Sequence, residues 1–231
     1  MNKKWLAGPY LVWMVGFIVI PLLLIVYYGL TDKSGAFTLA NVLSISTPEH
    51  VKALYLSLGL SLVSTVICLL LAYPLAMILR NRGIGQGSFI VFIFILPMWM
   101  NFLLRTLAWQ TLLEKSGVIN GILTALHLPN QSLINTPGAI ILGMVYNFLP
   151  FMVLPIYNVL CKIDDNTINA ARDLGASFTQ TLLWVWLPLS VPGIISGITM
   201  VFVPSLTTFV ISNLLGGSKI LLIGNVIEQE F

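Results

Sequence analysis

The run "ALYLSLGLSLVSTVICLLLAYPLAMIL", residues 53–79, contains no Asp, Glu, Lys or Arg. A helix needs about 20 apolar residues to cross the hydrocarbon core of a bilayer, so this run predicts a membrane-spanning helix. Four further apolar runs lie at residues 6–30, 88–108, 138–160 and 187–215, with Arg105 as their only charged residue. They are continuous, unlike the short alternating segments of a barrel. We therefore predict an all-α, polytopic transmembrane helical bundle that forms one domain over residues 1–231.

The composition supports lipid as the main solvent of this chain. Of its 231 residues, 58% are hydrophobic and 8% are charged, and the mean hydropathy is +0.96. A soluble domain carries about 25% charged residues. The net charge of +3 is too small to indicate nucleic-acid binding. The first run follows two lysines, as in a signal peptide, but it is too long and lacks a cleavage site, so we expect a retained span.

Orientation can be predicted from the basic residues near the ends of the runs, because these gather on the cytoplasmic side. If the N-terminus lies inside, the inner connections carry Lys3, Lys4, Arg80, Arg82, Lys162 and Arg172. The outer ones carry Lys33, Lys52, Arg105, Lys115 and Lys219. The small excess, and the two arginines in one tight turn, favour a cytoplasmic N-terminus.

The sequence offers no pattern for nucleotide or metal chemistry. It has no G-x-x-x-x-G-K-S/T phosphate loop, and "GGSK" at residues 216–219 has the wrong order. Cys68 and Cys161 are far apart, and His50 and His127 are isolated in connections. We therefore expect a non-catalytic chain that holds no metal and no cofactor of its own.

The connection before the last run, "NAARDLGASFTQTLLWVWLP" at residues 169–188, is richer than a plain turn. Asp164, Asp165 and Asn166 are candidate N-caps of a short helix. Gly175 can end that helix in a left-handed cap. Ser177 and Gln180 have the spacing of a capping box for a second helix. The pattern predicts helix, glycine corner, helix over about residues 164–186.

One face of the first short helix is small and apolar. It consists of Thr167, Ala170, Ala171 and Leu174. A helix this short is marginal alone, so it gains from docking into another surface. A membrane-surface helix is the alternative, but such helices carry bulky apolar groups and a Lys/Arg-rich face. The alanines and acids here favour a protein partner.

The connection resembles the EAA motif of ABC importer permeases. Ala170, Ala171, Gly175, Leu187 and Pro188 match the motif, while Asn169 replaces its glutamate and Val185 its isoleucine. The resemblance implies a pair of cytoplasmic coupling helices that dock into the ATPase subunit. It assigns this coupling to Asn169, Ala170, Ala171, Arg172, Asp173, Leu174 and Gly175.

Three more stretches, with the connection's "AARDLGAS", resemble the spermidine/putrescine branch: "LPMWMNFLLR" (96–105), "GMVYNFLPFMVLPIY" (143–157) and "LLGGSKILLIGNVI" (214–227). This implies a bacterial inner-membrane subunit with an ATPase dimer that binds ATP and Mg, a second, non-identical permease, an extracytoplasmic binding protein and a polyamine substrate. Family members have a sixth span after the last stretch. We therefore expect five spans here with a sixth missing, no transport by the chain ending at residue 231, and a loop over residues 216–231.

A polyamine must cross without help from acids, because no Asp or Glu lies within the five runs. Cation–π contacts and amides are the remaining options. The candidate path residues are Trp99, Asn101, Tyr146, Asn147, Phe209 and Asn213. The alternative is that these aromatic residues pack or lie at the membrane interface. Two other functions stay open: a permease for another small solute such as iron or thiamine, and a structural membrane subunit without a path.

Overall fold

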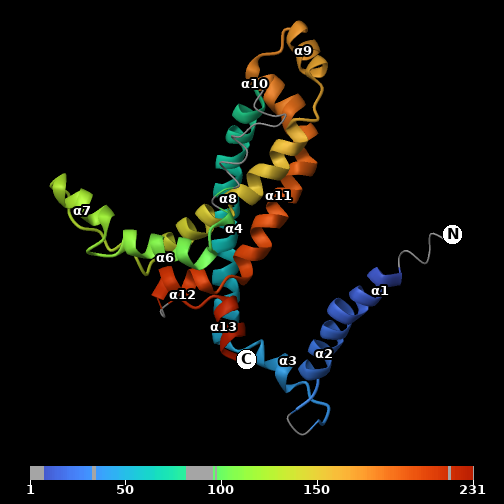
Figure 1. Cartoon of the computed structure of the whole chain (residues 1–231), viewed down its shortest axis with the longest axis vertical. Helices are drawn as coiled ribbons and strands as arrows, with labels where there is room; N and C mark the ends of the chain where they lie inside the picture. The colour runs from blue at the N-terminus through green and yellow to red at the C-terminus, as the bar shows by residue number, and fades with distance from the viewer. Residues whose placement is uncertain (1–7, 33–34, 82–95, 97, 218–219, 231) are drawn as a thin grey trace. The chain divides into compact units, whose positions relative to one another are not determined.

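The computed structural model in Figure 1 describes all residues except 1–7, 33–34, 82–95, 97, 218–219 and 231. The described residues form helices joined by turns, and their only β-type pairing is a single bridge between Thr31 and Phe37. Four of the described helices are long and apolar enough to cross a membrane: Gly8–Gly29, Pro48–Asn81, Pro137–Leu160 and Phe178–Thr207. The all-α class predicted from the sequence is confirmed.

The chain divides into two units, Met1–Lys52 and Ala53–Phe231. In the first unit, α1 (Gly8–Met14), the π-helical turn η2 (Val15–Val19) and α2 (Ile20–Gly29) follow one another without a break. None of their side chains is buried, as expected of a helix whose neighbour is lipid. The Asn41 side chain of α3 (Ala40–Ser44) donates to the carbonyls of Tyr28 and Thr31 and so holds the loop after α2.

The second unit is built on α4 (Pro48–Asn81), which enters this unit at Ala53, and on α8 (Pro137–Leu160). The buried stripe of α4 consists mostly of small side chains: Ser57, Ser61, Ser64, Cys68, Ala72 and Ala76, all with no exposed area. Small residues let helices approach closely in membranes. The Ser64 hydroxyl lies 3.3 Å from the sulfur of Met144, and the Cys68 thiol lies 3.8 Å from the carbonyl of Val145. The stripe therefore faces α8.

Helix α11 (Leu187–Thr207) packs along α8 through two glycines. A Cβ on Gly193 would lie 2.9 Å from the carbonyl oxygen of Pro155, and one on Gly197 would lie 2.6 Å from the sulfur of Met152. Tyr73 of α4 shares a 3.1 Å hydrogen bond with Ser190 of α11. The core of this unit is therefore a three-helix packing of α4, α8 and α11 (Figure 1).

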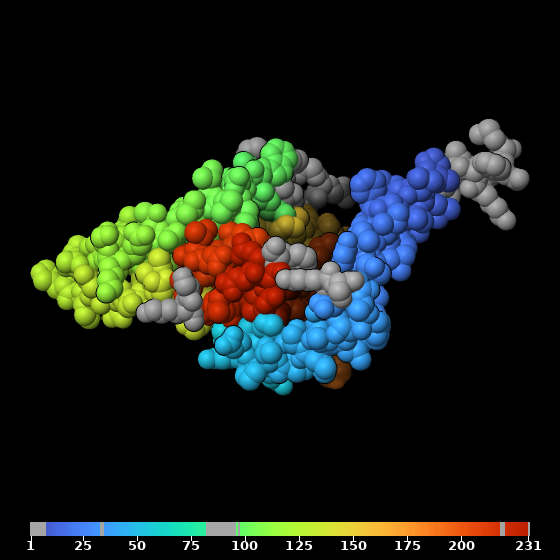
Figure 2. All heavy atoms as spheres, turned by 90° about the horizontal axis from the view of Figure 1, so that it is seen from below, coloured from blue at the N-terminus to red at the C-terminus, as the bar shows by residue number. Residues whose placement is uncertain are grey.

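Four shorter helices of the second unit lie away from residues 164–186 (Figure 1). These are α6 (Phe102–Leu113), α7 (Val118–Ala125), α12 (Val210–Gly216) and α13 (Ile223–Glu230). Figure 2 shows α12 and α13, in red, beside the green α6. The amide of Ile223 donates to the Ser57 hydroxyl of α4, which fixes the start of α13.

Three sequence-based expectations need correction here. The last predicted run is not one helix to residue 215, because α11 ends at Thr207 and Thr208 is extended with ψ 128°. A new helix, α12, begins after the break with Phe209 as its N-cap, and the Phe209 carbonyl accepts from the amide of Asn213 and from the side chain of Asn225 of α13. Residues 223–230 form α13 rather than a loop. The third run contains a helix start, since the Asn101 side chain accepts from the amides of Leu103 and Leu104; its residues 88–95 and 97 lie outside the described residues.

The other predicted runs correspond closely to observed helices. The second is α4, which begins five residues earlier, at a proline in the first turn. The fourth is α8, which has Thr136 as its N-cap and Pro137 at its first position. The first corresponds to Gly8–Gly29. Large apolar side chains such as Leu62, Leu70 and Ile195 are more than half exposed in the second unit, which is consistent with a lipid-facing surface.

Candidate functional site

The connecting segment, residues 164–186, folds as the sequence predicts. Helix α9 (Asp165–Asp173) begins at Asp164, whose side chain accepts from the amide of Asn166 at 3.0 Å. Helix α10 (Phe178–Thr181) begins at Ser177, and the capping box with Gln180 is complete in both directions. The π-helical turn η3 (Leu182–Trp186) then continues without a break into α11. The second short helix is therefore the start of a spanning helix.

The corner between the two helices is a glycine in the left-handed region. Gly175 has φ +85°. Its amide donates to the carbonyl of Arg172, and the amide of Ala176 donates to that of Ala171. These two bonds make a complete Schellman motif, which satisfies the last carbonyls of α9. A Cβ at Gly175 would meet nothing within 4 Å, so the position needs glycine for its φ and leaves open space beside it.

An open groove of about 370 Å³ lies between the two short helices. Its lining residues are Ala171, Leu174, Gly175, Ala176, Gln180, Thr181, Trp184 and Val185. Leu174 is 89% exposed and Trp184 is 79% exposed. The groove thus combines small lining residues with two large exposed apolar side chains, Leu174 and Trp184.

The predicted coupling residues fall into two groups. Ala171, Leu174 and Gly175 line the groove, whereas Asn169, Ala170, Arg172 and Asp173 are exposed on α9 away from its lining. Thr167 and Ala170, predicted on the same small face, are also exposed and not part of the lining. The sequence reasoning missed Ile168, which is 3% exposed and anchors α9 on the core. The sequence feature that could have identified Ile168 is its position as a single bulky apolar residue among small and polar neighbours.

The first four candidate path residues in the sequence do not form one cluster. Trp99 is 78% exposed and Asn101 caps α6. Tyr146 stacks edge-on against Trp109, with ring centroids 5.3 Å apart, and not against Trp99. Its neighbour Asn147 is 1% exposed and donates to the carbonyl of Gly143. The buried Oδ1 of Asn147 has no hydrogen-bond partner among the described residues.

The other two path candidates meet at the break after α11. Asn225 donates to the carbonyl of Phe209 at 3.4 Å and to the side chain of Asn213 at 2.6 Å. Asn213 in turn donates to the carboxylate of Glu228 at 3.1 Å. Asn225 and Glu228 escaped the sequence analysis because residues 216–231 were expected to form a loop. Helix α13 thus brings an acid next to a path candidate, although the predicted runs contain none.

Comparison with curated proteins finds several similar permeases, although no protein-family profile matches the sequence. The chain is 36% identical over 227 residues to the spermidine/putrescine transport system permease protein PotB of Haemophilus influenzae, covering 95% of this chain and 79% of that protein. It is 37% identical over 227 residues to the Escherichia coli protein of the same name, covering 95% and 82%. A homolog of PotB from Mycoplasma genitalium is 30% identical, with coverage of 94% and 76%.

Solved structures of bacterial ABC transporters share the fold. A chain of an alginate ABC transporter, in complex with a periplasmic protein bound to an alginate pentasaccharide, matches with a TM-score of 0.77 and 18% identity, over 99% of this chain and 82% of that one. A second alginate transporter structure gives a TM-score of 0.70 at 18% identity, over 99% and 84%. The extent and level of the sequence similarity lead to one conclusion: the chain belongs to the PotB family of spermidine/putrescine transport system permeases, the ABC importer branch that its connecting segment resembles.

Proposed function

We propose that this permease is a membrane subunit of an ATP-driven importer that takes up polyamines. The observation that carries the proposal is the 36–37% identity, over 95% of the chain, to permeases named for spermidine and putrescine. The helix–glycine–helix segment beside the groove supports the ATP-driven part, because its Schellman corner and capping box build a rigid docking element.

In this proposal the chain itself catalyses no reaction. An ATPase dimer binds ATP and Mg, and one ATPase subunit docks on the connecting segment of this chain. A second, non-identical permease completes the bundle, and an extracytoplasmic binding protein delivers the polyamine. Because η3 continues into α11, a push on α10 reaches a spanning helix directly. Alternating access then follows from the movement of α11 against its neighbours.

The proposed location is the bacterial inner membrane, with the N-terminus in the cytoplasm. The connecting segment must face the cytoplasm if it meets the ATPase, and this choice places Arg80, Lys162 and Arg172 inside. That agrees with the tendency of basic residues to stay on the cytoplasmic side. Cysteine introduced at Thr167, which is exposed on α9, should react with an impermeant thiol reagent only from the cytoplasmic side.

The substrate class can be tested by the ATP hydrolysis of the reconstituted complex. Binding protein loaded with spermidine or putrescine should stimulate hydrolysis, because only a loaded partner should shift the permease toward its outward-open state. Thiamine or ferric iron with their own binding proteins should have no effect. Stimulation by one of these solutes and not by a polyamine would show that this solute is the substrate. No stimulation by any of the solutes would indicate a structural subunit.

A separate prediction concerns the aromatic path candidates. Trp99→Ala and Tyr146→Ala should each lower spermidine uptake by about 2- to 30-fold, because a cation–π contact contributes ~0.5–2 kcal/mol. Tyr146→Phe should keep most activity, since it preserves the ring that packs on Trp109. Tyr55→Ala, at a 72% exposed position on α4, is the control. Normal uptake by both alanine variants at equal membrane levels would assign these rings to packing.

A further inference from the structure

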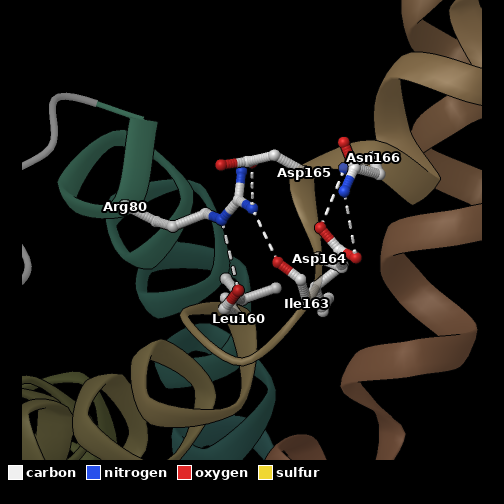
Figure 3. Close-up of polar contacts among 6 residues, drawn as sticks. All are labelled: Arg80, Leu160, Ile163, Asp164, Asp165 and Asn166. Atoms are coloured by element: carbon white, nitrogen blue, oxygen red, sulfur yellow. Dashed lines mark hydrogen bonds and ion pairs between the residues drawn. The ribbon is translucent and has the colours of Figure 1, made fainter.

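Arg80, in the last turn of α4, reaches into the turn between α8 and α9 (Figure 3). Its Nε donates to the carbonyl of Leu160 at 3.2 Å, and its Nη2 donates to the carbonyl of Ile163 at 3.0 Å. The same Nη2 forms a 2.6 Å ion pair with Asp165, the first residue of α9. The guanidinium carbon also lies 4.4 Å from the ring centre of Trp186. One side chain thus contacts α8, α9 and η3.

The strength of this contact comes mainly from its buried parts. Asp165 is 79% exposed, and an ion pair with so exposed a partner is weak by itself. The Arg80 side chain, however, is only 12% exposed, and Trp186 is 3% exposed. Leu160 is the last residue of α8, where carbonyls lack helical partners and the helix dipole attracts a cation. Only the planar fork of arginine can serve two carbonyls, a carboxylate and an indole face together.

The Arg80 contact links α4 directly to the connecting segment, to which α4 is not adjacent in the sequence. The connecting segment is covalently continuous with α8 before it and with α11 after it. Helix α4 does not adjoin the segment in the sequence, because Arg80 and Asp165 are 85 positions apart. At this end of the bundle, α4 also approaches the α11 region through Trp186. A movement of the connecting segment would therefore reach α8 and α11 through the backbone, and it would reach α4 directly through Arg80, besides the packing of α4 on α8 and α11.

We propose that Arg80 is a positioning residue that makes α4 move as one body with the connecting segment during the transport cycle. The proposal rests on the proposed function, in which the ATPase acts on that segment. Arg80 does not line the groove. Its loss should leave ATPase docking intact and weaken the transmission of movement to the spanning helices.

The test separates docking from transmission. Arg80→Ala, Arg80→Lys and Asp165→Asn are compared with Lys162→Ala, which removes an exposed cation from the same turn. For each variant, the amount of captured ATPase, the hydrolysis stimulated by loaded binding protein and the uptake per captured complex are measured. Arg80→Ala should capture the ATPase normally but lose stimulation and uptake by about 2- to 30-fold, the usual range for coupling residues. Arg80→Lys should lose less, Asp165→Asn little, and Lys162→Ala nothing.

A distance measurement keeps the test decisive if Arg80→Ala accumulates poorly. Spin labels at Ile78 of α4 and Thr167 of α9, both exposed, should give one narrow distance with and without ATP in the parent. The distribution should widen or change with ATP in Arg80→Lys. Normal stimulation and uptake in the Arg80 variants, or losses that only follow the amount of complex, would overturn the proposal. Failure of the parent to capture any ATPase would instead overturn the proposed function, and this inference with it.

Discussion

ATPase capture should fall at least tenfold when Gly175 is replaced by aspartate, while the permease remains in the membrane. Gly175 lies at the corner of the connecting segment and lines its groove, so an aspartate there would add an unpaired charge to a close contact. Burying such a charge costs about 1–3 kcal/mol or more. The backbone adds a smaller penalty, because φ +85° disfavours a residue with a Cβ by ~1–2 kcal/mol. Affinity capture from detergent extracts, beside uptake in the same cells, measures both effects.

The matched control for this variant is Gly175→Asn, which has the same shape without the charge and tolerates a left-handed backbone. It should retain most capture. Ala171→Glu, on the floor of the groove, should behave like Gly175→Asp. Asp164→Ala should matter much less, because it removes one N-cap bond worth ~0.5–2 kcal/mol and its neighbours can substitute. Normal capture and normal uptake by both charged variants would rule out docking at this segment.

The second large effect is expected in the membrane core. Gly193→Val should sharply reduce the amount of folded permease, because its Cβ would lie 2.9 Å from the Pro155 carbonyl and 3.0 Å from Val159. A backbone atom cannot rotate away, so α8 and α11 would have to separate. Overpacking of this kind costs about 1–3 kcal/mol or more. The temperature at which the purified protein unfolds, together with its level in membranes, reports the loss.

Gly59→Val on α4 provides the comparison, since a Cβ there meets nothing within 4 Å. It adds the same side chain to an exposed position of a spanning helix. Both variants add apolar surface to a spanning helix, so only the packing differs. Equal stability of Gly193→Val and Gly59→Val would show that α8 and α11 are not packed as closely as the structure indicates.

The local parts of the connecting segment could be predicted because their causes are local. Asp164 and Ser177 satisfy backbone amides two or three residues away, and Gly175 is needed for one φ value. Such features depend on residue type and spacing alone. The long apolar runs are predictable for the same reason, since length and hydropathy set the ability to span a bilayer.

The missed features depend on contacts between distant parts of the chain. The break at Thr208 lies inside an apolar run that looks continuous in the sequence, and α13, whose Asn225 reaches the Phe209 carbonyl, packs beside it. The groove requires both short helices to be placed in space. The role of Arg80 was also hidden, because its partners Leu160, Asp165 and Trp186 lie far along the chain. In the sequence, Arg80 counted only as a basic residue at the end of a run.

The central claim is that this permease carries polyamine across the membrane when a docked ATPase hydrolyses ATP. The most direct measurement is the uptake of labelled spermidine into proteoliposomes that contain the permease, its partner permease and the ATPase, with binding protein added outside and ATP enclosed. We expect uptake that requires ATP, stops when the permease is omitted and falls at least tenfold with Gly175→Asp. ATP-dependent uptake that is unchanged without the permease or with Gly175→Asp, or no spermidine uptake by the complete system, would contradict the claim.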